Sequence, residues 1–231
     1  MNVLIIGIFF MILSFVVSSR LKRKFKKYSL IPLSSNLSGK EIAERMLADN
    51  RIYDVSVNSY EGSLTDHYNP STKTINLSEP VYHGRNAASA AIASHECGHA
   101  VQHATAYRFL EMRSALVPLQ NASGKILNFI VLASIFGGFF FFSVFPMDLV
   151  LLIIIGVYAV LTLFSFITLP VEFDASKRAL LWIDEKGITN SQEHAMAKDA
   201  LKWASLTYVV AALGSLVTLL YYVSIFLGSR D

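Results

Sequence analysis

One short segment of the chain carries residue types that could bind a metal ion: His95–His99, which reads HECGH. Residues four apart on a helix share a face, so the imidazoles of His95 and His99 can reach one Zn²⁺ ion. Glu96 lies one position further round the helix and can act on a metal-bound water instead of on the metal. The spacing therefore predicts a catalytic zinc site with one ion per chain.

The residues around this motif are those of a buried helix. Ala88–Ser94 precedes it and Ala100–Val101 follows it, and we expect an Ala-rich helix from about Arg85 to Leu110. Buried imidazoles and carboxylates need partners, which a metal ion provides. Two solvated surface histidines beside an ion-pairing glutamate, the simpler alternative, would not require such flanks. Cys97 points to a different face from the histidines and is interpreted as a small buried hydrophobe.

A catalytic zinc site usually has three protein ligands and one position for water. His103 lies ~12 Å along the helix axis from His95, which is too far for both to bind one ion. A metzincin would have its third histidine at position 105, which is Thr105. Among distant carboxylates, Glu172 stands out because it directly follows an apolar stretch, and Asp174 is a close competitor.

The composition argues against an ordinary soluble enzyme. Of the 231 residues, 53% are apolar and 16% are charged, whereas soluble domains carry about 25% charged residues. With 16 Phe, 10 Tyr and only 6 Pro, the chain is not a disordered one. The single cysteine excludes a disulfide scaffold.

The excess of apolar residues is concentrated in four stretches that contain no charged side chain. Crossing a bilayer takes about 20 apolar residues. Buried helices of a soluble bundle would be expected to show a polar face, and these stretches show none. We therefore predict four transmembrane helices, at Val3–Ser18, Ile126–Phe145, Leu149–Leu169 and Leu206–Leu227.

The basic residues predict the orientation in the membrane. Six of the 20 Lys and Arg residues lie within Arg20–Lys27, after the first stretch, and none precedes it. This pattern favours an uncleaved anchor over a signal peptide, and it is too local to indicate a nucleic-acid partner. If the N-terminus lies outside, residues 20–125 and 170–203 face the cytoplasm and hold every basic residue except Arg230.

The cytoplasmic segments are expected to contain both helices and strands. Ser38 and Glu41 have the form of a capping box, and Asn190 with Glu193 forms a second cap. Period-two alternation on both sides of a turn at Asn69–Thr72 predicts a hairpin. The expected elements are helices at 38–50, at 171–183 and from 190 into the fourth stretch, and strands at 52–57, 63–68 and 73–77.

The strand that contains Asp66, His67 and Tyr68 is a candidate for substrate binding. An extended peptide can add to an exposed sheet edge through main-chain hydrogen bonds. Such a strand beside the metal helix would hold a substrate across the zinc ion. An ordinary core strand is the alternative.

These motifs resemble those of the YugP-type neutral zinc metallopeptidases of bacterial membranes. The resemblance is carried by His95–His103 and Leu169–Leu180, and it extends to Leu64–Pro70 and Thr207–Val209, so it spans most of the chain. More distantly, the chain is similar to the HtpX and CAAX-protease gluzincins, which place H-E-x-x-H and a later glutamate at a membrane surface.

The resemblance implies that His95, His99 and Glu172 bind zinc and that Glu96 is the catalytic base. It also implies a location in the plasma membrane of a bacterium. One departure is Ser176, which stands where the HtpX-like pattern has an aspartate. The carboxylate that usually orients a zinc-binding histidine is thus replaced, and Asp174 or another group has to take that role.

We accordingly interpret the protein as a membrane-embedded zinc metalloendopeptidase that acts on protein or peptide substrates near the bilayer. Zinc lowers the pKa of bound water towards about 7, and Glu96 takes its proton and delivers it to the leaving amine. A further donor should stabilise the oxyanion, and Tyr208, His67 and His194 are candidates.

Two other functions are compatible with the motif. In the first, zinc is structural and is closed in by four protein ligands, with His67 or His83 as the additional one. In the second, the protein is a proteolytically silent scaffold or chaperone. An intact Glu96 argues against both, because a structural site needs no base.

The expected fold is that of a mainly α integral membrane protein with four transmembrane helices and a small α+β zincin-like cytoplasmic domain. The expected segments are a first transmembrane helix (1–19), the catalytic domain (20–125), a helical hairpin (126–169), cytoplasmic helices with the third ligand (170–203), and the fourth transmembrane helix with a short outside tail (204–231).

Overall fold

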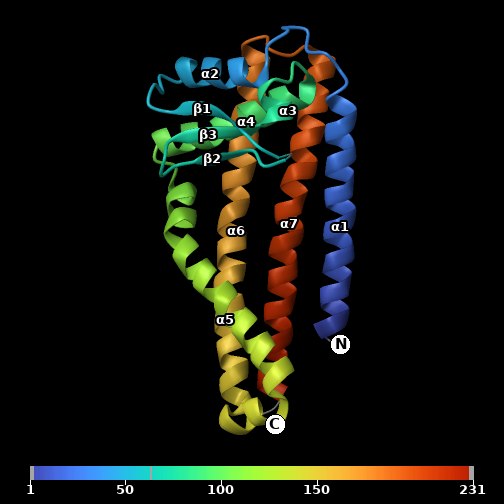
Figure 1. Cartoon of the computed structure of the whole chain (residues 1–231), viewed down its shortest axis with the longest axis vertical. Helices are drawn as coiled ribbons and strands as arrows, with labels where there is room; N and C mark the ends of the chain where they lie inside the picture. Colours follow the sequence, from blue (N-terminus) through green and yellow to red (C-terminus); the bar gives the residue numbers. More distant parts are fainter. Residues whose placement is uncertain (1–2, 63, 229–231) are drawn as a thin grey trace. The chain divides into compact units, whose positions relative to one another are not determined.

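A computed structural model describes residues 3–62 and 64–228, except for the side chains of residues 139 and 141–143. The protein is mainly helical with one small sheet, as expected (Figure 1). The expected strand start at Ser63 and the tail with Arg230 lie outside the described residues. The elements are α1 (Val3–Tyr28), α2 (Gly39–Asp49), β1 (Ser56–Tyr60), β2 (His67–Asn69), β3 (Thr74–Ser78), α3 (Glu79–Tyr82), α4 (Ala87–Ala104), α5 (Arg108–Val144), α6 (Met147–Glu185) and α7 (Ser191–Gly228).

The chain divides into two compact units. The first, here called the helical unit, comprises Met1–Ser14, Met112–Leu169 and Tyr208–Asp231. The second, the mixed unit, comprises Phe15–Glu111 and Pro170–Thr207. The mixed unit therefore contains the sheet and the whole HECGH motif.

Four helices of the described chain are long and apolar enough to cross a membrane. They are α1, the Arg108–Gly138 part of α5, α6 and α7. Large apolar side chains such as Phe15, Phe136 and Leu220 are exposed on them. A soluble protein rarely exposes contiguous apolar surface of this extent, because transfer of such surface out of water is favourable.

The Ala-rich helix is shorter than predicted, since α4 ends at Ala104 and not near Leu110. Ala106 adopts a positive φ of 49°. The amide of Tyr107 donates to the Gln102 carbonyl (2.9 Å), and that of Ala106 donates to the His103 carbonyl (3.2 Å). This geometry is a Schellman motif, which usually has glycine at the left-handed position. Because alanine stands there in this chain, no residue type in the sequence predicted that the helix ends here.

The sheet has the strand order β1-β3-β2. β2 is antiparallel to β3, which confirms the predicted hairpin, and β1 is parallel to β3. β2 covers only His67–Asn69, so it is shorter than the predicted strand at 63–68 and includes the first residue of the predicted turn. The first strand begins at Ser56 and not at Ile52, because Ile52 closes the end of α2: its amide donates to the Leu47 carbonyl (2.9 Å). Only one side of β2 is paired within the sheet, so its other side is an edge.

The motif helix α4 lies in the core of the mixed unit. Most of its alanines, among them Ala90 and Ala93, are fully buried and allow neighbouring elements to approach closely. α2 packs against it and begins with the predicted capping box of Ser38 and Glu41. Cys97 is buried in this core with its thiol directed at the Ala43 carbonyl (3.4 Å). The packing holds the motif on a rigid element.

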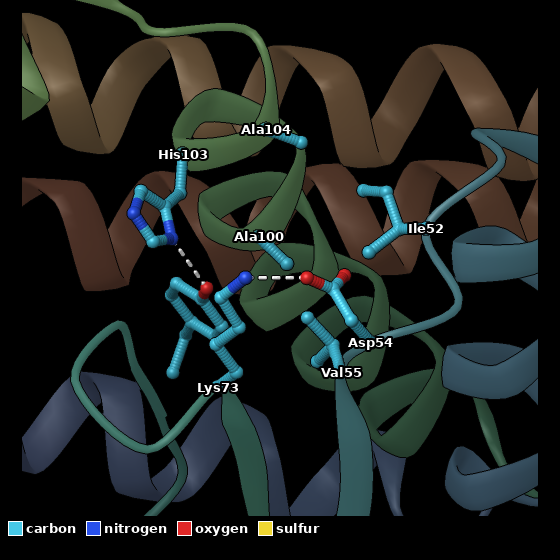
Figure 2. A pocket seen from close by; sticks show the side chains of 8 residues that line it. Ile52, Asp54, Val55, Lys73, Ala100, His103 and Ala104 are labelled. Carbon is cyan, nitrogen blue, oxygen red and sulfur yellow. Dashed lines mark hydrogen bonds and ion pairs between the residues drawn. The ribbon is translucent and has the colours of Figure 1, made fainter.

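A pocket of about 160 Å³ lies in the mixed unit (Figure 2). Ala100 and His103 line it from α4. An ion pair between Asp54 and Lys73 and a hydrogen bond between the Tyr68 hydroxyl and His103 Nδ1 (2.7 Å) form part of its wall. His103, which the helix geometry excluded as a zinc ligand, therefore contributes to this pocket.

Candidate metal centre

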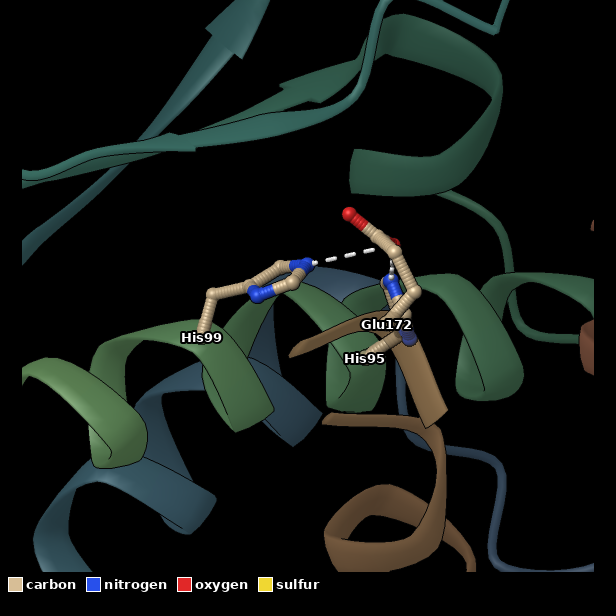
Figure 3. A group of neighbouring side chains, drawn as sticks. All are labelled: His95, His99 and Glu172. Atoms are coloured by element: carbon tan, nitrogen blue, oxygen red, sulfur yellow. Dashed lines mark ion pairs between the residues drawn. The ribbon is translucent and has the colours of Figure 1, made fainter. Parts of the chain in front are cut away.

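Two helices bring three potential metal ligands together (Figure 3). His95 and His99 project from α4, and their ring centroids are 4.7 Å apart. Glu172 projects from α6, and its Oε2 atom lies 3.4 Å from His95 Nε2 and 3.6 Å from His99 Nε2. One donor atom from each side chain lies within 4.8 Å of the others.

The close approach of the two helices depends on the glycine of the motif. A Cβ atom on Gly98 would lie 2.6 Å from the Ala175 carbonyl oxygen and 3.0 Å from its Cα atom. Only a residue without a side chain allows this approach, because both neighbouring atoms belong to the backbone. Gly98 thus lets α6 come near enough for Glu172 to reach the two imidazoles.

The separation of the donor atoms fits a zinc ion. Zinc binds imidazole nitrogen and carboxylate oxygen at about 2.0–2.2 Å, so two ligands at the tetrahedral angle are about 3.4 Å apart. The observed separations from Glu172 Oε2 to the two Nε2 atoms agree with this value. Two imidazoles and one carboxylate are also a donor set that catalytic zinc sites use.

Glu172 is almost completely buried, with 2% of its surface exposed. Burial alone would raise the pKa of its carboxyl group, but the contacts with His95 and His99 outweigh burial and hold the pKa well below its ordinary value. Burial likewise lowers the pKa of His99, and the Glu172 carboxylate more than compensates and raises it. The centre therefore favours a positive charge between these side chains.

Each imidazole has a partner on its far nitrogen. The Ser176 hydroxyl lies 3.1 Å from His95 Nδ1, and Gln102 Oε1 lies 3.1 Å from His99 Nδ1. These partners leave the Nε2 atoms of both rings free to face Glu172. The Ser176 hydroxyl therefore contacts His95 on the side of the ring that is turned away from Glu172.

Gln102 was not singled out in the sequence. Its position three residues after His99 puts both on one face of α4, and that spacing is the signal that could have identified it. Asp174, the second candidate for the third ligand, accepts hydrogen bonds from Gln102 Nε2 (2.9 Å) and Arg178 Nε (2.6 Å). The carboxylate that faces both imidazoles is that of Glu172.

The predicted substrate strand lies at the sheet edge and contacts α4. Asp66 is turned inward, where it accepts hydrogen bonds from the amide (2.8 Å) and hydroxyl (3.0 Å) of Ser78, and burial raises the pKa of its carboxyl group. The ring of His67 contacts the Thr65 carbonyl and the Asn76 amide group. Tyr68 links β2 to α4.

The other sequence candidates do not belong to this group of three donors. Within the described residues, the group of potential ligands includes neither His67 nor His83, so it lacks the fourth protein ligand of a closed structural site. His194 Nδ1 lies 3.9 Å from an Asp184 carboxylate oxygen. Tyr208 belongs to the helical unit.

Comparison with known proteins gives a match over nearly the whole chain. Residues 3–227 match a family described as "Putative neutral zinc metallopeptidase". A relative from Bacillus subtilis (strain 168), "Putative membrane protease YugP", is 41% identical over 219 residues, which cover 95% of this chain and 94% of the relative. No solved structure matches.

Proposed function

Because the chain belongs to this family of neutral zinc metallopeptidases, we propose that it hydrolyses peptide bonds as a zinc-dependent endopeptidase. One observation carries the proposal: two helices bring His95, His99 and Glu172 together at separations that fit a zinc ion. Glu96 is buried and directly follows His95 in the chain, and we assign it the role of the general base.

The zinc ion would be held by the Nε2 atoms of the two histidines and by the carboxylate of Glu172. The chemistry that zinc supplies in such a site is a bound water whose pKa falls from about 15.7 towards about 7, together with polarisation of the substrate carbonyl. Glu96 accepts the proton of the attacking water and delivers it to the leaving amine. Ser176 and Gln102 keep the two imidazoles in the orientation that presents Nε2.

A peptide substrate would bind in an extended form along the edge of β2. The free side of this strand offers main-chain hydrogen bonds, and its contact with α4 sets it beside the motif helix. Two of the three predicted side chains support this arrangement. The hydroxyl of Tyr68 forms a hydrogen bond with His103 on α4, and Asp66 accepts a hydrogen bond from the Ser78 amide at the end of β3. Main-chain recognition implies little dependence on substrate sequence.

The protein would act as an integral membrane enzyme with its site on the cytoplasmic side. Four long apolar helices and a relative described as a membrane protease support membrane insertion. The basic residues of segments 20–125 and 170–203 support a cytoplasmic location for the site. Suitable substrates are membrane proteins with exposed cytoplasmic segments, or peptides near the bilayer.

Substitution of the proposed base tests the mechanism. The wild-type protein and its Glu96→Gln variant are purified in detergent, their zinc content is measured, and cleavage of an unfolded membrane protein is followed. We expect Glu96→Gln to retain zinc and to lose activity by about 10²–10⁴-fold, the usual contribution of a general base.

Glu44→Gln is the matched control, because Glu44 is exposed on α2 and pairs with Lys40 at the surface. This variant should keep both zinc and activity. Equal activity of Glu96→Gln and wild type would overturn the mechanism. Zinc binding without any peptidase activity in the wild type would favour the structural-zinc or scaffold alternatives.

A further inference from the structure

Gln102 is a fully buried side chain whose polar atoms all have partners. None of its surface is exposed. Its Oε1 atom lies 3.1 Å from His99 Nδ1, and its Nε2 atom donates to the Val171 carbonyl (2.8 Å) and to Asp174 Oδ2 (2.9 Å). The amide thus contacts α4 and α6 at the same time.

The partners determine which way the amide points. The Val171 carbonyl and the Asp174 carboxylate can only accept hydrogen bonds, so the NH₂ group of Gln102 has to face them. The carbonyl end of the amide then faces His99, and the only group that can donate to it is a proton on Nδ1. His99 is therefore held in the tautomer whose Nε2 lone pair faces Glu172.

The same side chain also holds the segment that carries the third ligand. Val171 immediately precedes Glu172, and its carbonyl is tied to Gln102 across the helix interface. One amide therefore orients a ligand on α4 and fixes the backbone beside a ligand on α6. Asp174, itself paired with Arg178, keeps the amide from turning over.

We propose that Gln102 is a positioning residue that assembles the metal centre from its two helices, and that Asp174 acts through it. This inference rests on the proposed function, because it concerns the same zinc site. It requires glutamine at position 102: glutamate would lose both donors and place a carboxylate against that of Asp174, and methionine would fill the space with neither a donor nor a strong acceptor.

The test compares zinc affinity and coordination geometry in Gln102→Met, Gln102→Glu and Asp174→Asn with the wild type. Zinc affinity is measured by competition with a chelator, and geometry is measured from the visible absorption of the cobalt(II)-substituted protein. We expect Gln102→Met and Gln102→Glu to bind zinc about 10–100-fold more weakly than wild type and to change the cobalt spectrum. Gln192→Met, a change at an exposed glutamine on α7, should alter neither measurement.

Asp174→Asn keeps the proposal testable if the substitutions at Gln102 prevent folding. An asparagine amide can turn its own NH₂ group towards Gln102 and remove the constraint on it, so zinc affinity should fall here as well. Wild-type affinity and an unchanged cobalt spectrum in Gln102→Met or in Asp174→Asn would overturn the inference. If His99→Ala left the zinc affinity of the protein unchanged, the proposed metal centre itself would be wrong.

Discussion

Gly98 of α4 faces the backbone of Ala175 on α6 so closely that a single methyl group at position 98 would lie 2.6 Å from the Ala175 carbonyl oxygen. This contact joins the helix that bears the two histidines to the helix that bears Glu172. Since the atoms that would clash belong to the α6 backbone, α6 as a whole would have to move.

The first prediction concerns this contact. Gly98→Ala should displace α6 from α4, weaken zinc binding by at least tenfold and lower the free energy of unfolding by about 1–3 kcal/mol, as overpacking does. Chelator competition and thermal unfolding in detergent measure the two effects. Gly124→Ala is the control, because a Cβ atom at position 124 meets open space and alanine favours a helix. Unchanged zinc affinity in Gly98→Ala would show that the close contact does not support the centre.

A second prediction concerns Ser176, which holds His95 in place of a carboxylate. Ser176→Ala removes the hydrogen-bond acceptor for Nδ1 and should weaken zinc binding about tenfold. Ser176→Asp restores a carboxylate at this position, and its charge-assisted hydrogen bond should bind zinc at least as tightly as wild type does. If alanine and serine give the same zinc affinity, His95 is oriented by other contacts.

A third prediction concerns the end of α4. Ala106 adopts the left-handed conformation that glycine prefers, at a cost of about 1–2 kcal/mol. Ala106→Gly removes this cost but gives the unfolded chain more conformational entropy, which offsets part of the gain. We therefore expect the free energy of unfolding to rise by about 0.5–1 kcal/mol. Ala195→Gly, inside α7, should have the opposite effect. Equal destabilisation by both substitutions would contradict the Schellman ending.

A fourth prediction concerns pH. Hydrogen bonds from the Ser38 amide and hydroxyl, together with Arg85, lower the pKa of the Glu41 carboxyl from 4.5 to about 2. Above pH 4.5 the carboxylate is ionised in the folded and unfolded chain, and its stabilisation is fully present. Between pH 4.5 and about 2 the unfolded chain takes up the proton first, so this stabilisation is lost as the pH falls.

Glu41→Gln isolates this contribution. The midpoint of thermal unfolding in detergent should fall less steeply from pH 5 to pH 3 in the variant than in wild type, because the variant has no proton to take up at position 41. The difference should shrink at high salt, since Glu41 and Arg85 are both partly exposed. Parallel curves for the two proteins would refute the assignment.

A fifth prediction concerns the edge strand. Tyr68→Phe removes the hydrogen bond between β2 and His103 and leaves the ring in place. If a peptide binds along β2, the loosened strand should raise KM several-fold and leave zinc content unchanged. A variant with wild-type KM would indicate that the substrate does not depend on this strand.

Several elements of the fold could be predicted because their causes are local. The capping box of Ser38 and Glu41 and the alternation around Asn69–Thr72 act over a few residues, and both predicted the right kind of element, although β2 covers His67–Asn69 where a strand at 63–68 was expected. The end of α4 could not be predicted, because Ala106 carries no sign of a left-handed backbone. The four apolar stretches predicted helices, but not that one of them begins as early as Arg108.

The metal centre, too, could be predicted only in part, because one of its ligands is set by contacts between residues far apart in the sequence. The spacing of His95 and His99 sufficed to put both on one face of a helix. The position after the apolar stretch favoured Glu172 but left Asp174 as a close competitor, since both are acidic and two residues apart. Their difference arises from packing between helices, which turns one carboxylate to the imidazoles and the other to Gln102.

The order of the ligands along the chain has a consequence for biogenesis. His95 and His99 are made first, and the whole of Met112–Leu169 is synthesised before Glu172 leaves the ribosome. A nascent or truncated chain that ends between His99 and Glu172 therefore holds two donors and cannot form the centre. The three-ligand site can be completed only after both apolar segments of the intervening stretch have been made.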